Sequence, residues 1–312
     1  MGFRLWETGV DPFIVAMKLT YVTLDVFTST PYYGNPVAIV NIPAEHASML
    51  TPEKLQLIAR EFNFSETVFL REQSADDARE GLVRIQINTP WAEVPFAGHP
   101  TVGTTNYLLR YLKHENFKVL VTKAGRIAVQ LNEGGGDVSL EVAHNIKIHV
   151  QPFTHPALGA FPVVSIVKGM SFIMAKMPDL EALAKQNKGF RENSYVDLGG
   201  LDEGWQVGLL ATYCYVDLGI DESGTRRIRT RCLSMGEDPA TGSAASALTC
   251  YLALQEEPAK RTIRFKVTQG VEMGRKSDIS VEVTKTSDGN AIEKVVLSGT
   301  AVRIMEGSLE AP

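Results

Sequence analysis

Two segments of the chain, far apart in the sequence, share the same arrangement of residues. Residues 97–109 (AGHPTVGTTNYLL) and 241–253 (TGSAASALTCYLA) each place a Gly and a small polar or His residue at the start of an apolar helix. A helix N-terminus exposes unpaired N–H groups and a positive dipole end, so each segment can hold an anion such as a carboxylate. The pair predicts two pseudo-symmetric domains with one cleft between them. The alternative is that Gly and Ser open these helices without binding anything.

The remaining pattern mixes strands with a few helices. A helix is predicted to start at Thr51, which caps it, with Pro52 in its first turn and apolar residues at helical spacing. A second helix is predicted near 179–188, and the Gly-rich residues 133–137 form a turn. Alternation and β-branched residues predict strands at 19–27, 37–40, 66–71, 82–88, 279–283 and 294–304. Since the strand pattern begins just after Met17, residues 1–16 form an extension of unknown role.

The charge balance excludes some classes of partner. A net charge of −5 and scattered Lys and Arg predict no nucleic-acid partner. No apolar run reaches the length that spans a bilayer, and the N-terminus lacks a clean signal peptide, so no membrane partner and a cytoplasmic location are expected.

The sequence also lacks the usual motifs for metals and cofactors. The three cysteines show no CxxC spacing, the six histidines form no HxH or HExxH pattern, and buried free thiols are the expected state. There is no GxGxxG after the first strand and no GxxxxGK[ST]. We therefore expect no metal and no cofactor.

Two carboxylates are candidates for chemistry. Glu66 lies among aromatic and aliphatic residues in EFNFSETVFL (61–70). In a closed apolar cleft the pKa of its carboxyl would rise, and Glu66 could act as a proton shuttle near neutral pH. The alternative is that Glu66 lies on the solvent-exposed face of a strand. Asp238 precedes a helix and is either a second cleft carboxylate or a residue that complements the helix dipole.

The smaller polar candidates each have a structural alternative. His99 either donates a hydrogen bond or relays protons, or it packs at a helix start. Ser243 and Ser65 either contact substrate, or cap a helix and pair within a sheet. Asn35, in Gly-Asn-Pro, either reaches the cleft or forms a turn.

Taken together, these segments resemble the PhzF (phenazine-biosynthesis) family from about Met17 to the C-terminus. The segments that match the family are 25–40 (DVFTSTPYYGNPVAIV), 58–70 (IAREFNFSETVFL), 95–104 (PFAGHPTVGT), 236–248 (GEDPATGSAASAL), 269–277 (QGVEMGRKS) and 295–307 (VVLSGTAVRIMEG). The motifs SET, GHPT and EDPATGS in this order are specific to that family.

The resemblance implies an α+β fold of the diaminopimelate-epimerase type. Each of its two pseudo-symmetric domains would be a curled, mostly antiparallel sheet around a central helix, with the active site in the cleft between them. The N-terminal domain would cover 17–130 plus about 295–312, and the C-terminal domain 131–294. A homodimer is also expected by likeness.

The resemblance further implies a cofactor-independent isomerase of secondary metabolism that acts on a small carboxylated, amino- or hydroxyl-bearing ring. Glu66 would be the acid/base, assisted by His99 and Asp238. The residues expected to bind substrate are Ser65, Gly98, Gly242, Ser243 and Asn35. The alternatives are an epimerase or racemase, or a non-catalytic small-molecule-binding protein.

Three local departures from the family pattern bear on the reaction and the substrate. Related epimerases carry a cysteine before each helix, where this chain has Ala97 and Thr241, which argues against a two-thiol racemase. Trp91 and Val94 stand where relatives commonly have small residues and Leu, and Lys276 stands where Pro is frequent. These changes affect the expected substrate and leave the expected fold unchanged.

Overall fold

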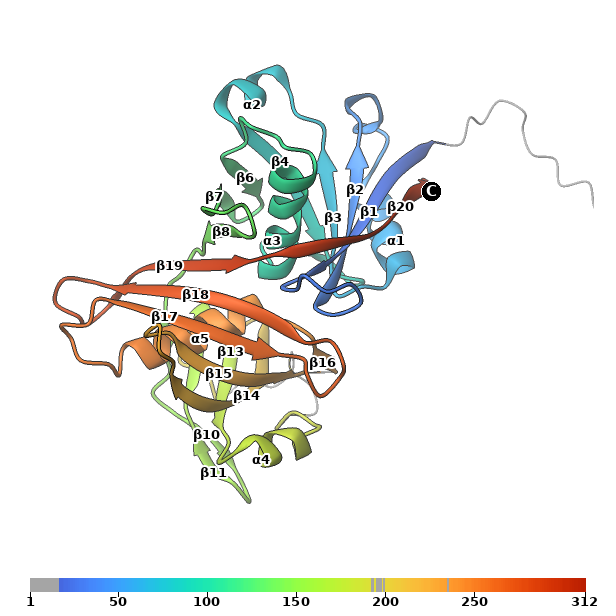
Figure 1. Cartoon of the computed structure of the whole chain (residues 1–312). Helices are drawn as coiled ribbons and strands as arrows, with labels where there is room; N and C mark the ends of the chain where they lie inside the picture. The colour runs from blue at the N-terminus through green and yellow to red at the C-terminus, as the bar shows by residue number, and fades with distance from the viewer. Residues whose placement is uncertain (1–16, 192–193, 195–197, 199, 235) are drawn as a thin grey trace, which may run out of the picture.

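The computed structural model describes residues 17–191, 194, 198, 200–234 and 236–312, so the predicted extension 1–16 lies outside it. The described chain is an α+β fold dominated by sheet, as predicted, with two groups of strands that each surround a helix (Figure 1). We call the elements around α3 (Gly98–Asn106) the first lobe and those around α5 (Gly242–Ala253) the second lobe. No helix in the described residues is long and apolar enough to cross a membrane.

The first lobe contains most of the amino-terminal strands. Strand β2 runs antiparallel to β1 and parallel to β3, and β4 pairs antiparallel with β3 and parallel with β6. Its elements are β1 (Lys18–Val26), β2 (Asn35–Ile42), η1 (Ala44–His46), α1 (Pro52–Phe62), β3 (Thr67–Arg71), α2 (Ala75–Glu80), β4 (Leu82–Asn88), β5 (Glu93–Val94), α3, η2 (Tyr107–Tyr111), β6 (Val119–Thr122) and β7 (Gly125–Leu131).

The second lobe is also mostly antiparallel, with parallel pairs at β13–β14 and β15–β17. Its elements are β9 (Lys147–Ile148), β10 (Phe153–His155), β11 (Gly159–Phe161), β12 (Val163–Val167), β13 (Met170–Lys176), α4 (Leu180–Lys185), β14 (Leu209–Ile220), β15 (Arg226–Leu233), β16 (Glu237–Asp238), α5, β17 (Thr262–Gln269) and β18 (Ser277–Lys285).

Three strands connect the two lobes. Strand β8 (Val138–Glu141) pairs with β7 on one side and with β19 (Ile292–Gly299) on the other, and β19 also pairs with β18. The chain then continues into β20 (Ala301–Glu310), which runs antiparallel to β1 along its whole length (Figure 1). The carboxyl-terminal strand therefore belongs to the same sheet as β1, the first strand of the chain. The domain boundaries themselves remain a prediction.

Both central helices are buried on all sides, which their composition makes possible. Every residue of α3 is buried, and so is every residue of α5 except Tyr251. Their hydroxyl groups donate to carbonyls one turn earlier, such as Thr101 to Ala97 and Ser246 to Gly242. Because these bonds satisfy the polar side chains internally, helices rich in Thr and Ser can occupy a sheet's core without unpaired donors.

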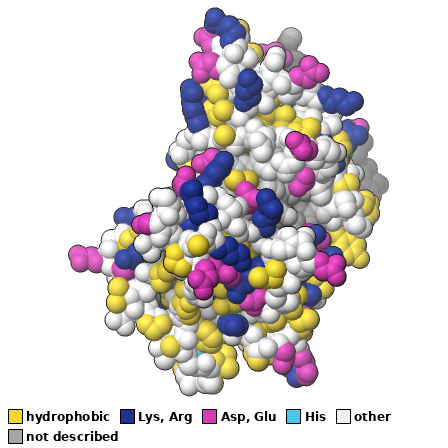
Figure 2. All heavy atoms as spheres, turned by 60° about the vertical axis from the view of Figure 1, so that its left-hand side comes forward, with side chains coloured by type: hydrophobic (Ala, Val, Ile, Leu, Met, Phe, Trp, Pro, Cys, Tyr) yellow, Lys and Arg dark blue, Asp and Glu magenta, His cyan; other side chains and the backbone are white. Residues whose placement is uncertain are grey.

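Several local predictions are confirmed. Helix α1 begins at Pro52, and the Thr51 side chain accepts a hydrogen bond from the backbone N–H of Lys54. All three cysteines are free and buried. On the face drawn in Figure 2, Lys and Arg side chains lie among Asp and Glu side chains.

Candidate active site

A cleft of about 1440 Å³ opens between the lobes. It is lined by the segment before β3, by the N-termini of α3 and α5, and by the loop that follows β15. All eight residues that the sequence suggested for the site line this cleft: Asn35, Ser65, Glu66, Gly98, His99, Asp238, Gly242 and Ser243. The topology therefore brings together residues that are more than two hundred positions apart.

The two helix N-termini approach each other through glycines. A Cβ atom on Gly242 would lie 2.9 Å from Leu297 Cδ2 and 3.4 Å from the Cα of Gly98. The N-cap residues, Ala97 and Thr241, accept no hydrogen bond from their helices through a side chain. Because no cap side chain binds them, the first-turn N–H groups of both helices are available to other acceptors, such as an anionic ligand.

Glu66 lies immediately before β3, with its carboxyl group in the cleft. Its side chain is 18% exposed, and its Oε2 is buried and accepts no hydrogen bond. Burial raises the pKa of this carboxyl to about 7, although the Ser65 hydroxyl acts in the opposite direction. A carboxyl group in this state can both release and take a proton near neutral pH.

His99 is the second residue of α3 and faces Glu66. Its Nδ1 lies 3.3 Å from Glu66 Oε2, and the ring is almost fully buried. Burial lowers the pKa of His99 to about 4, against the opposing effects of the Asp238 carboxylate and the Pro36 backbone. The imidazole is therefore neutral at physiological pH and contacts the Glu66 carboxyl as a dipole, without forming an ion pair.

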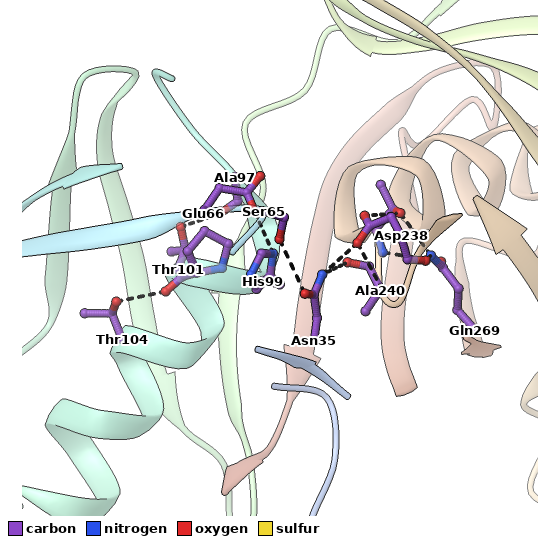
Figure 3. A network of polar contacts seen from close by, with 12 residues as sticks. Asn35, Ser65, Glu66, Ala97, His99, Thr101, Thr104, Asp238, Ala240 and Gln269 are labelled. Atoms are coloured by element: carbon purple, nitrogen blue, oxygen red, sulfur yellow. Dashed lines mark hydrogen bonds and ion pairs between the residues drawn. The ribbon is translucent and has the colours of Figure 1, made fainter. Parts of the chain in front are cut away.

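Asp238, at the end of β16, is held by donors from both lobes. Its Oδ1 accepts a hydrogen bond from Asn35 Nδ2 at 2.8 Å, and its Oδ2 accepts one from Thr241 Oγ1 at 2.6 Å. Burial raises the pKa of Asp238 to about 6, and the nearby Glu66 carboxylate contributes. Figure 3 shows Asn35 between Asp238 on one side and the Glu66–His99 pair on the other.

Asn35 and Ser65 extend this network across the cleft. The Asn35 amide also donates to the Ala240 carbonyl at 3.1 Å, and its Oδ1 accepts from the Ser65 hydroxyl at 3.4 Å. Asn35 is buried at the first position of β2, so it is both the end of a turn and a residue of the cleft. Gly-Asn-Pro therefore both ends a turn and places Asn35 in the cleft.

Gln269, at the end of β17, is a member of the network that sequence reasoning did not single out. Its Nε2 donates to the Asp238 carbonyl and to Thr241 Oγ1, and its Oε1 accepts from the Tyr213 hydroxyl at 3.0 Å. Gln269 is fully buried and fixes the loop that carries Asp238. Its position at the start of the family-like segment 269–277 was the only signal in the sequence.

The cysteines contribute little to the chemistry of the cleft. Cys232 lines the cleft opposite Asp238 in the β15–β16 pairing, which the sequence did not indicate. Its thiol is buried, which raises its pKa far above the usual range, so a thiolate is disfavoured there. Among the described residues, no group of three or more His, Cys, Asp or Glu side chains is arranged to hold a metal ion.

Comparisons with known proteins agree with the architecture. The family model for phenazine biosynthesis-like protein (PhzC-PhzF) matches residues 24–307. A trans-2,3-dihydro-3-hydroxyanthranilate isomerase of Pseudomonas fluorescens is 31% identical over 313 residues, covering 93% of this chain and 98% of the relative. An uncharacterized isomerase of Mesorhizobium japonicum is 28% identical, covering 93% of this chain and 98% of the relative.

Solved structures resemble the fold over nearly its whole length. A PhzF-family protein of Bacillus anthracis superposes with a TM-score of 0.71 at 24% identity, covering 94% of this chain and 99% of the other. A hydroxyproline epimerase of Agrobacterium vitis superposes with a TM-score of 0.62 at 15% identity, covering 95% of this chain and 94% of the other. At these identities the likeness concerns the fold alone.

Proposed function

The chain belongs to the family of phenazine biosynthesis-like proteins (PhzC-PhzF), and from this premise we propose that it is an isomerase that moves a carbon-bound proton on a small carboxylated ring. The curated relatives are named as isomerases, which supports the reaction class. The amino or hydroxyl group on the ring, the absence of a cofactor from the reaction and the identity of the acid/base residue are our proposals.

The observation that carries the proposal is the state of the Glu66 carboxyl. It combines a pKa near 7 with a buried oxygen that no hydrogen bond occupies. A carboxylate that is fully hydrogen-bonded would be stabilised in its charged form and would be a weak base. Glu66 retains one oxygen that can accept a proton from carbon.

The reaction can be written with Glu66 as the only group that carries the proton. The Glu66 carboxylate removes a proton from one ring carbon, and the electron pair of that C–H bond forms a new double bond to the neighbouring carbon. The electron pair of the existing double bond moves at the same time to the far carbon. The protonated Glu66 then returns the proton to the far carbon of the allylic system. No proton or electron is gained or lost overall, so the step needs no external oxidant or reductant.

The other cleft residues have supporting roles in this proposal. The first-turn N–H groups of α3 and α5, with Gly98, Gly242 and Ser243, bind the substrate carboxylate. The Asp238 carboxylate accepts a hydrogen bond from the ring amino or hydroxyl group. The neutral imidazole of His99 orients the Glu66 carboxyl from 3.3 Å.

Proton exchange with solvent tests the proposal. Candidate cyclic amino and hydroxy carboxylic acids are incubated in deuterated water, and deuterium incorporation at carbon is followed by NMR. We expect exchange with the wild type and a loss of at least about 100-fold in Glu66→Gln, which keeps the shape but removes the base.

A matched variant separates the role of Glu66 from a general effect of losing a carboxylate. Glu61→Gln makes the same chemical change at an exposed position of α1 and should leave the exchange rate unchanged. Exchange that persists in Glu66→Gln would refute Glu66 as the acid/base. Tight binding of these acids without exchange in the wild type would indicate a binding protein.

A further inference from the structure

The cleft is larger than a single ring requires. Its volume of about 1440 Å³ exceeds the range of about 300–1,000 Å³ that is usual for sites enclosing drug-sized ligands. The polar network of Glu66, His99 and Asp238 occupies only one part of it. The rest of the first-lobe lining includes an apolar wall formed by Phe64, Pro90, Trp91, Val94, Pro95 and Phe96; the polar residues Asn63, Thr89 and Arg126 also line the cleft on this side.

The loop that carries Trp91 is held in place by several hydrogen bonds. The Thr89 hydroxyl accepts from the backbone N–H groups of Trp91 and Ala92. Two side chains of helix α1 hold the loop from below: Gln56 donates to the Thr89 carbonyl at 2.8 Å, and Arg60 donates to the Pro90 carbonyl at 3.1 Å. The backbone beneath Trp91 is thus fixed before any ligand binds.

The Trp91 side chain itself is left largely in solvent. It is 71% exposed although it lines the cleft. The indole keeps most of its apolar surface in water, so contact with an apolar group of a ligand would gain hydrophobic free energy. An aromatic side chain on a fixed backbone at the mouth of a cleft is suited to stacking on a planar group, because little backbone entropy is lost on contact.

We propose that Trp91 is a specificity-determining residue and that the substrate carries a second planar, apolar group beyond its carboxylated ring. The carboxylated ring lies at the Glu66 end, and the second group stacks on the Trp91 indole along the apolar wall. The assignment of the first ring rests on the proposed function. The substrate class is therefore a carboxylated ring with an aromatic or other planar substituent, larger than a lone amino-hydroxy acid.

The test measures binding without turnover. Calorimetry in the Glu66→Gln background compares two probes, 2-aminobenzoate and 2-(benzylamino)benzoate, which differ by one planar ring. We expect the two-ring probe to bind about 3–10-fold more tightly, the range of one aromatic contact. Adding Trp91→Ala should abolish this advantage while leaving the affinity for 2-aminobenzoate unchanged, and Trp91→Phe should retain part of it.

Leu57→Ala is the control, because Leu57 is a large exposed residue of α1 outside the cleft lining and should not alter the ratio of the two affinities. A two-ring advantage that survives Trp91→Ala would overturn the proposal, as would equal affinity for the two probes. Trp91-dependent binding combined with a failure of proton exchange in the wild type would refute the isomerase function and leave the stacking role standing.

Discussion

Arg275 joins the two lobes through hydrogen bonds, and we predict that its removal lowers the stability of the protein. It lies between β17 and β18 in the second lobe, and its guanidinium donates three hydrogen bonds to the first lobe, two to the turn between β1 and β2 and one to Asp25 of β1. The acceptors are the Gly34 carbonyl at 2.9 Å, the Tyr32 carbonyl at 2.9 Å and Asp25 Oδ1 at 2.7 Å. This turn leads directly into Asn35, which donates to Asp238.

The size of the effect follows from the burial of Asp25. Its side chain is only 5% exposed, and that of Arg275 is 26% exposed. Removing one partner of a buried ion pair costs about 3–5 kcal/mol, since the other charge stays behind without compensation. Asp25 keeps a second hydrogen bond, from the Tyr32 backbone N–H at 2.7 Å. We therefore expect Arg275→Ala to lower the free energy of unfolding by about 3 kcal/mol, near the lower limit.

Urea denaturation followed by circular dichroism and by fluorescence measures this loss. The neighbouring variant Lys276→Ala is the control, because the Lys276–Asp278 pair is about half exposed and should contribute less than about 1 kcal/mol. In the double variant Asp25→Ala/Arg275→Ala, the cost should be less than the sum of the single costs by roughly 1–3 kcal/mol. A loss in Arg275→Ala no larger than that in Lys276→Ala would show that the guanidinium does not hold the lobes together.

Three further predictions concern pH, backbone and thiols. Since burial raises the pKa of Glu66 to about 7 and only its carboxylate can take a proton, kcat/KM should rise with pH around that value; a flat profile over about pH 5–9 would contradict the assignment. Gly34 has a φ of 69°, and a Cβ there would lie 2.3 Å from the Val26 carbonyl oxygen, so Gly34→Ala should lower the free energy of unfolding in urea by at least about 2 kcal/mol. The control Gly204→Ala, with a φ of 78° and no atom within 4 Å, should cost only about 1 kcal/mol. Because all three cysteines are buried, a thiol reagent such as DTNB should label them only after denaturation, and rapid labelling of the native protein would refute their burial.

The sequence predicts those elements whose signals are local. The apolar helices that begin at the glycines of GHPT and EDPATGS and the Thr51-capped helix are found where their patterns place them. Helix α2 was not predicted, because its residues ADDARE show no apolar periodicity, although Ser74 caps one end and Gly81 closes the other. Pairings such as β8 with β19 depend on contacts between distant segments, and no local pattern encodes them.

The same distinction applies to the site. Residue types and family likeness select Glu66, His99 and Asp238, but they do not reveal what each side chain contacts. The hydrogen bond from Asn35 to Asp238 joins residues 203 positions apart, and the support from Gln269 comes from a third segment. These contacts depend on how the lobes pack. Only the structure therefore distinguishes Asp238, whose two carboxylate oxygens both accept hydrogen bonds, from Glu66, whose Oε2 accepts none.

That distinction supports the different roles that we propose for the two carboxylates. Both are buried and have a raised pKa, so desolvation alone does not distinguish them. Asp238 accepts a hydrogen bond from Asn35 on one oxygen and from Thr241 on the other, and these bonds stabilise its charged form and weaken it as a base. Glu66 Oε2 accepts no hydrogen bond, although His99 Nδ1 lies 3.3 Å from it, so a proton can arrive there without breaking a hydrogen bond. Proton transfer therefore has the smaller reorganisation cost at Glu66, whereas Asp238 is suited to orient the substrate; this asymmetry favours one shuttling group over the two opposed bases of a racemase.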